Sequence, residues 1–306
     1  MKRVRDLAIV TLVVNVIVIV LGALVRATGS GAGCGSSWPT CRGTIIPELE
    51  GATAIEFTHR AASGVALLLV AALVWLVFRR TERRHPARLG AVASGISIVI
   101  EALIGAFIVL AELVADDTSV ARAVSVPIHL VSTFVLLAGL VLTVFWLSGG
   151  GRLRFREHRR LALPLAAIGI GMLLIAGTGG VTALADTLFP KESFDVGGIF
   201  DAASTENVLT RLRALHPVVA VLIGLVAAWW AASNAWSARG GAGRAAKAVV
   251  VIVALEVSVG IVNVLLLAPT WLSLVHLVLA DGLWVAWVWL GAELLQETGS
   301  APRFEG

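Results

Sequence analysis

The chain has 306 residues, of which 58% are hydrophobic and only 14% are charged, and its mean hydropathy is +0.92. A soluble domain usually has about 45–50% apolar and about 25% charged residues, so this composition excludes a soluble globule as well as a disordered or collagen-like chain. The net charge of +4 and the pI near 9.8 do not indicate a nucleic-acid partner. The basic residues instead alternate with hydrophobic blocks, as they do in the loops of membrane proteins.

Eight hydrophobic blocks follow one another along the chain, each close to the length of about 20 residues that an α-helix needs to cross a bilayer. The sequence therefore predicts an all-α protein of the cell membrane with eight transmembrane helices. The first block follows a basic start but lacks a clear cleavage site, so we expect a retained helix rather than a signal peptide. Tryptophans near block ends, such as Trp146 and Trp230, are expected in an interfacial belt. The blocks cover residues 8–26, 58–78, 89–111, 126–147, 161–184, 214–234, 247–268 and 271–292.

The distribution of Lys and Arg predicts the orientation in the membrane. Most of the 24 basic residues lie in the segments that share a side with the N-terminus, as in the arginine-rich loop at residues 79–88. Cytoplasmic loops carry such an excess. With an even number of spans, both termini are predicted to be cytoplasmic, and the loops containing Cys34 and Glu206 are predicted to face outward.

The two halves of the chain contain similar motifs in the same order. Each has a glycine-rich segment, then a His, then a Glu four residues before a Gly, then a second His. This predicts two repeat-related four-helix bundles, residues 1–150 and 151–306, related by an axis along the membrane normal. The matching positions are His59 and His216, Glu101 to Gly105 and Glu256 to Gly260, and His129 and His276.

Four of the six histidines are expected near the outer ends of helices, whereas His85 and His158 are expected in solvated cytoplasmic loops. Polar side chains in a span tend to face the bundle interior. Two imidazoles from different helices of a bundle suit the iron of a haem, and the macrocycle fits between apolar helices. Zinc would usually take three or four ligands packed together. The pattern predicts two bis-histidine haem sites, with hydrogen-bonding core histidines as the alternative. The expected pairs are His59 with His129, and His216 with His276.

Both cysteines, Cys34 and Cys41, lie in the first outer loop. Cysteines outside the cytoplasm tend to pair, so we expect a disulfide. Two interpretations remain open: a staple for a glycine-rich loop, or an exposed redox-active dithiol over the haem site.

Three acidic residues are candidates for a functional role. Glu56 would share a helix face with His59, where it could accept a proton or bind a reaction intermediate. It could also be an acid that complements the start of the helix dipole. Glu101 and Glu256 fall near the middle of spans, and either a functional role or a duplicated structural hydrogen bond would explain them.

Several of these motifs resemble the haem A synthase family over nearly the whole chain. The resemblance is carried by Gly22-Ala-Leu-Val-Arg26-Ala-Thr-Gly-Ser-Gly31, the Cys34/Cys41 loop with Trp38-Pro39, Glu56-Phe-Thr-His59-Arg60, and the later His129, His216-Pro217 and His276. It implies two successive oxidations of the C8 methyl group of haem O, which give the formyl group of haem A for terminal oxidases. It also implies a substrate haem held by His59 and His129 beside a catalytic Glu56, and a resident haem b held by His216 and His276.

The same resemblance implies partners: haem O synthase as the supplier of substrate, terminal oxidase assembly, and a membrane quinol or another electron donor. Two other classes of function remain alternatives. One is a di-haem b-type electron-transfer protein that oxidises quinol, and the other is a non-enzymatic haem carrier for oxidase assembly.

Overall fold

The computed structural model describes residues 1–190 and 215–297, and the prediction of an all-α protein is confirmed for them. Apart from a short 3-10 turn, η1 (Ser30–Ala32), and two isolated bridges, these residues form helices and connections. Eight helices are long and apolar enough to cross a membrane. They are α1 (Lys2–Ala27), α2 (Gly51–Arg80), α3 (Ala87–Leu110), α4 (Val120–Leu147), α5 (Arg159–Leu188), α8 (Leu215–Ala235), α9 (Gly241–Leu265) and α10 (Thr270–Leu295).

Several helices extend beyond the hydrophobic blocks that predicted them. The second block was expected from residue 58, but α2 begins at Gly51 and runs for 30 residues. At about 1.5 Å per residue, such a helix is about 45 Å long, more than the hydrocarbon core of about 30 Å. Hydropathy finds only the apolar part of a helix, whereas the first turns of α2 are held by contacts with the preceding loop.

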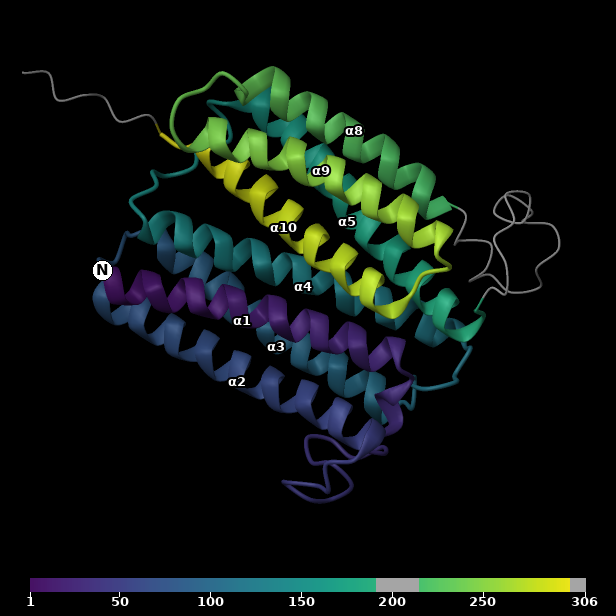
Figure 1. The fold of residues 1–306 in the computed structure, drawn as a ribbon. Coiled ribbons are helices and arrows are strands. Elements are labelled where there is room, and N and C mark those ends of the chain that lie inside the picture. The colour runs from purple at the N-terminus through teal and green to yellow at the C-terminus, as the bar shows by residue number, and fades with distance from the viewer. Residues whose placement is uncertain (191–214, 298–306) are drawn as a thin grey trace, which may run out of the picture.

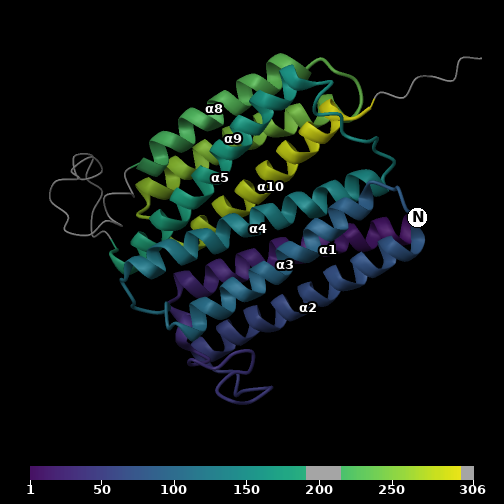
Figure 2. The ribbon, with the colours of Figure 1, turned by 180° about the vertical axis from the view of Figure 1, so that it is seen from behind.

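The helices form two groups of four that pack side by side (Figures 1 and 2). In the N-terminal bundle, α1 packs on α2, α2 on α3, α3 on α4 and α4 back on α1; in the C-terminal bundle, α5, α8, α9 and α10 follow the same order. The two bundles meet through α1, α4, α5 and α10. This is the pattern expected of two units related by an axis parallel to the helices.

The start of α1 and the end of α10 lie at one end of the molecule, and the loop between α1 and α2 lies at the other (Figure 1). Since the helices alternate in direction, His59, His129, His216 and His276 all lie toward the end with that loop. The loop containing Glu206, which was predicted to face outward, lies outside the described residues.

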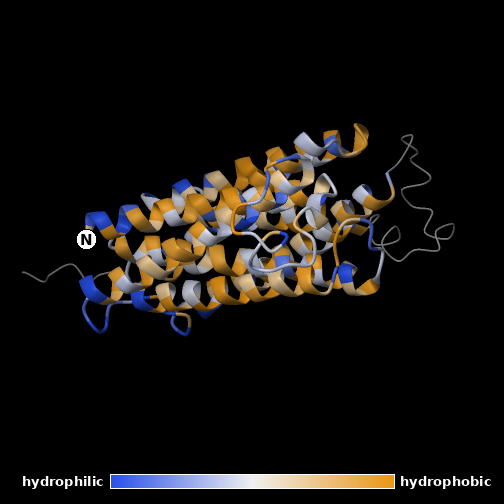
Figure 3. Ribbon diagram, turned by 90° about the horizontal axis from the view of Figure 1, so that it is seen from below, coloured by the Kyte–Doolittle hydropathy of each residue, from blue (hydrophilic) through white to orange (hydrophobic). Residues whose placement is uncertain are grey.

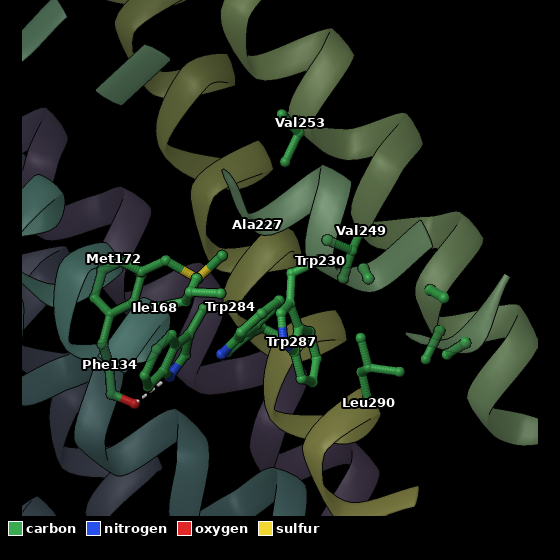
Figure 4. Packing of buried hydrophobic residues seen from close by; sticks show 14 of the residues in the cluster. Phe134, Ile168, Met172, Ala227, Trp230, Val249, Val253, Trp284, Trp287 and Leu290 are labelled. Carbon is green, nitrogen blue, oxygen red and sulfur yellow. Dashed lines mark hydrogen bonds between the residues drawn. The ribbon is translucent and has the colours of Figure 1, made fainter. Parts of the chain in front are cut away.

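Aromatic side chains fill much of the contact between the bundles and the core of the second bundle (Figure 4). Trp284 of α10 donates its indole N–H to the carbonyl of Phe134 on α4 at 2.6 Å, and the two rings meet edge to face. Trp230 packs against Trp287 with ring centroids 5.5 Å apart. The expectation of an interfacial belt was wrong for Trp230 and for Trp146, which are 6% and 7% exposed, because both side chains pack inward.

Many large apolar side chains are exposed along the helices. Hydrophilic residues gather toward the helix ends (Figure 3). Helix α4 differs from the others: 61% of its most apolar window is buried, against 33% or less elsewhere among the described spans. Its central position, against α1, α3, α5 and α10, explains this burial.

Candidate functional site

The loop between α1 and α2 folds back on the start of α2. Cys34 and Cys41 form the expected disulfide, with an S–S distance of 2.03 Å. Thr53 of α2 donates its hydroxyl to the carbonyl of Gly33 at 2.8 Å. A Cβ on Gly33 would lie 2.4 Å from the carbonyl oxygen of Ala52, so only glycine allows this close approach.

Both cysteines are buried, with 0% and 1% of their surface exposed. The alternative of an exposed redox-active dithiol is therefore wrong in one respect: the two sulfur atoms are not exposed, because the loop covers the disulfide. The staple interpretation agrees with the burial.

Glu56 is the residue that ties this loop to the helix. Its Oε2 accepts the backbone N–H of Cys34 at 2.7 Å, and its Oε1 accepts the Nε and Nη2 groups of Arg60 at 3.1 and 2.5 Å. Arg60 also donates Nη1 to the carbonyls of Ser37 and Thr40 at 2.6 and 2.9 Å. Glu56 is only 3% exposed, so it is not a solvated acid at a helix start. A carboxylate has about four acceptor positions, and three are used here, which leaves one on Oε2.

The four candidate histidines form two pairs, one within each bundle. His59 and His129 lie near each other in the N-terminal bundle, and His216 and His276 lie near each other in the C-terminal bundle. All four are half-buried. Among the residues that the structure describes, no group of three or more His, Cys, Asp or Glu side chains is placed to hold a bare metal ion. Imidazoles that come in twos match the number of axial positions on a haem iron.

A glycine of the preceding helix faces each imidazole. A Cβ built on Gly22 would lie 2.9 Å from Cε1 of His59, and one on Gly179 would lie 3.0 Å from Cε1 of His216. The first distance is shorter than real side chains show, and the second is tight enough that the His216 ring would have to shift by a few tenths of an ångström. A side chain at either position would therefore press on the imidazole. On the other two helices the fit is looser: Gly105 and Gly260 would bring a Cβ to 3.7 and 3.4 Å from their histidines.

The histidines of α2 and α8 share a second feature. His59 lies against the backbone of Val18, although its buried Nδ1 has no aligned hydrogen-bond partner. His216 lies against the backbone of Ile175, and its Nδ1 is 3.2 Å from the Thr178 hydroxyl.

The histidines of α4 and α10 instead face acids within the membrane. Nδ1 of His129 lies 2.9 Å from Oε2 of Glu101, and Nδ1 of His276 is in ion-pair contact with Oε2 of Glu256. These are short contacts between a carboxylate oxygen and a ring nitrogen, and the ring N–H groups are not aligned as hydrogen bonds. The structure thus brings Glu101 and Glu256, which the sequence alone left without a role, directly to the histidines.

Arg26, part of the motif that carried the family resemblance, joins the two bundles. Its Nη1 donates to the carbonyl of Ala183 and to the hydroxyl of Thr187, the latter at 2.6 Å, both on α5.

The two loop histidines, His85 and His158, stay apart from the site. His85, between α2 and α3, accepts the N–H of Ala87 at Nδ1, and burial lowers the pKa of this imidazole.

Sequence reasoning found the histidines, Glu56 and the cysteines, but gave no role to the facing glycines. A signal was present, since the separation from Gly22 to Gly179 equals that from His59 to His216, and Gly105 and Gly260 repeat with Glu101 and Glu256.

A family model described as cytochrome oxidase assembly protein, COX15-CtaA, matches residues 5–54 and 48–288. The chain belongs to this family. Heme A synthases of Bacillus licheniformis and Bacillus pumilus are 36% and 38% identical to it over 144 and 162 residues, which are 47% and 53% of this chain and 46% and 49% of those proteins. The chain is thus similar to proteins named for haem A synthesis, and the resemblance inferred from the motifs is confirmed.

A protein of another name matches more of the chain. The protoheme IX farnesyltransferase of Thermus thermophilus is 42% identical over 300 residues, which cover 95% of this chain and 48% of that protein. The chain thus spans about half the length of the curated relatives that it matches.

Proposed function

We propose that this member of the COX15-CtaA family is a haem A synthase that oxidises the C8 methyl group of haem O in two steps. The observation that carries the proposal is the pair of imidazoles in each bundle, combined with Glu56 and the disulfide loop that it holds, which lie beside the histidine pair of the N-terminal bundle. Relatives named heme A synthase support it over about half of the chain.

The residues present fit two haems. Each bundle supplies two nitrogen ligands, and glycines leave the space that a Cβ would take beside the imidazoles of His59 and His216. Ligand histidines usually turn their second nitrogen to a carboxylate or a backbone carbonyl, and both kinds of neighbour occur here. We assign His59 and His129 (N-terminal bundle, within residues 1–150) to the substrate haem, and His216 and His276 (C-terminal bundle, within residues 151–306) to a resident haem b.

A resident haem b would supply one-electron chemistry to the reaction. The contribution of this chain is to hold the substrate between His59 and His129 and to place Glu56 near it, one turn before His59 on α2. Arg60 and the N–H of Cys34 fix the Glu56 carboxylate, so its orientation is set before substrate binds. We place proton acceptance at Oε2 of Glu56, because that oxygen has one acceptor position left. The loop above α2 would exclude water from that side.

The farnesyltransferase relative raises a second possibility, because its matched half covers nearly all of this chain. About half of that protein lies outside the match, so its name does not decide which activity the matched half has. We propose haem O synthase as the supplier of substrate and terminal oxidase assembly as the recipient of the product. Because the partner is an electron donor, each step also needs dioxygen as the oxidant: one oxygen atom enters the C–H bond, and two electrons from a membrane quinol or another donor, with two protons, reduce the other atom to water.

The test is expression of the protein in cells that lack haem A, with and without a separate haem O synthase. Haem species are then separated by chromatography. Haem A that appears only when haem O is supplied supports the proposal. Haem O made by the protein alone would indicate prenyl transfer, and unmodified haem B and haem O would favour the electron-transfer or carrier alternatives.

The proposed orientation, with both termini cytoplasmic and the haem sites toward the outer face, can be tested on exposed residues. Ile45 lies in the disulfide loop and is 83% exposed, whereas Phe155 lies at the opposite end and is 58% exposed. An impermeant thiol reagent added to intact cells should label Ile45→Cys and spare Phe155→Cys. The reverse pattern would overturn the orientation without affecting the proposed activity.

A further inference from the structure

We propose that Glu101 and Glu256 are positioning residues that hold the imidazoles of His129 and His276 at Nδ1 and so direct Nε2 of each toward a haem iron. This inference rests on the proposed function, because it assumes that both histidines are axial ligands.

The first support is the contact itself, made twice. In each bundle the carboxylate of the third helix reaches Nδ1 of the histidine on the fourth. Glu101 and Glu256 are only 7% and 9% exposed, and acids at such depth in a membrane protein are costly unless they are paired. A carboxylate at Nδ1 fixes which ring nitrogen carries the proton, and leaves Nε2 as the lone-pair donor.

The second support is the sequence Glu-x-x-x-Gly, found on both α3 and α9. Residues four apart lie on one face of a helix, so the acid and the glycine meet the same imidazole. A Cβ at Gly105 would have Cε1 and Nε2 of His129 as its nearest atoms, and at Gly260 it would have Cε1 and Nε2 of His276. Nδ1 therefore lies at the acid, and the Nε2 edge lies beside a residue with no side chain.

The third support is that the acids accompany only one histidine of each pair. His59 and His216 lie against helix backbone, and no ion pair with an acid is found for either in the described part of the chain. Each haem would have one histidine with a carboxylate at Nδ1 and one that lies against helix backbone. A carboxylate makes the ligand more basic and favours ferric iron, so the acids would lower the reduction potential.

The two acids differ in their other neighbours. Glu101 also accepts a hydrogen bond at Oε1 from the Ser132 hydroxyl on α4. Glu256 has no such donor among the described residues and interacts electrostatically with Asp281 of α10, which is 1% exposed. The two carboxylates therefore differ in support: the Ser132 hydroxyl holds Glu101 from a second side, and no hydroxyl does so for Glu256 among the described residues. Replacing Glu256 therefore tests its contact with His276 without disturbing a second hydrogen bond.

The experiment compares the purified wild-type protein with its resident haem, Glu256→Gln, and Glu101→Gln as the matched control in the other bundle. Glutamine keeps the shape and removes the charge. Glu256→Gln should retain haem and shift the reduction equilibrium toward ferrous iron about tenfold, equal to about 59 mV for one electron. Electron paramagnetic resonance of the ferric haem should show altered low-spin g-values. Glu101→Gln should leave the resident haem unchanged and weaken retention of added haem O about 10–100-fold.

An unchanged potential and unchanged g-values in Glu256→Gln would overturn the inference. If that variant loses its haem, Glu256→Asp decides: retained haem with altered g-values supports a positioning carboxylate, and lost haem overturns it. A wild-type protein that binds no haem would instead refute the proposed function itself, which keeps the two failures apart.

Discussion

In the N-terminal bundle, the first histidine of the pair lies one turn from Glu56, whose carboxylate holds the disulfide loop. In the C-terminal bundle, the matching histidine has a threonine hydroxyl beside it, and that half of the chain contains no cysteine. Both bundles share the facing glycines and the acid behind the second histidine. The shared features, the histidine pairs with their glycines and acids, are those that would bind a haem. The features found only in the N-terminal bundle, Glu56 and the disulfide loop, are those that would act on it.

The largest expected effect separates the two pairs of histidines. His216→Ala should remove the resident haem from the purified protein, because the iron loses an axial ligand. His59→Ala should leave that haem bound and reduce the yield of haem A. The pyridine haemochrome spectrum measures the first effect and chromatography of extracted haems the second. Loss of the resident haem from His59→Ala would contradict the assignment of the bundles.

Glu56 should matter for the reaction and not for the resident haem. Glu56→Ala should lower haem A production by about 10²-fold or more, the range found when a proton-transferring group is removed. Glu50→Ala, an exposed acid just before α2, is the matched control and should produce haem A normally. Glu56→Gln keeps an acceptor for the N–H of Cys34, and so separates loss of charge from loss of the loop. Normal haem A yield in both Glu56 variants would refute the catalytic role.

The disulfide should stabilise the N-terminal bundle alone. Replacing both cysteines with serine should destabilise the loop by about 2–3 kcal/mol, according to the entropy of so short a closed loop. Thermal unfolding followed by loss of haem A production should occur at a lower temperature, with the resident haem spectrum unchanged. Mass spectrometry after alkylation without reductant should find both thiols blocked in the native protein. Two alkylated cysteines in fresh membranes would show that the disulfide does not form.

The smallest expected effect distinguishes tight from loose glycine contacts. Gly22→Ala places a methyl group 2.9 Å from the His59 ring and should cost about 1–3 kcal/mol or displace the ring. Gly105→Ala is the control, since its methyl group would lie at an ordinary 3.7 Å from His129. Affinity for added haem O, measured by its absorption change, should fall in the first variant and stay near wild type in the second. If both variants bind haem O with the same affinity, the short distance between Gly22 and the His59 ring does not limit binding.

Much of the fold could be predicted because the bilayer imposes simple demands on a sequence. Each span must satisfy its own backbone hydrogen bonds and be apolar for about 20 residues, so hydropathy alone located the eight helices. The ends were less predictable, as at Gly51, because the first turns of α2 are stabilised by a loop contact rather than by hydropathy. Trp230 was misplaced for a similar reason: a position near a span end does not show which way the side chain points.

The residues that make up the candidate site could be named from the sequence, and their role in binding a haem stays a prediction. Repetition along the chain singled out four histidines and two acids, and the cysteines were expected to pair because of their compartment. No local pattern could show that Glu56 binds Arg60 and the Cys34 backbone at once, since those contacts require the loop to fold back on α2. The same holds for Arg26, whose partners on α5 lie in the other half of the chain.

The sequence by itself determined the eight spans, their order, and which side chains with the capacity to bind metal stand near one end of the bundle. The tertiary structure decided which of these side chains meet. Hydrophobic periodicity and residue type are properties of one helix, whereas the pairing of Glu101 with His129, or of Glu256 with His276, depends on how two helices are rotated against each other. That rotation is set by packing, where small residues such as Gly90 on α3 and Gly139 on α4 let the two helices approach closely.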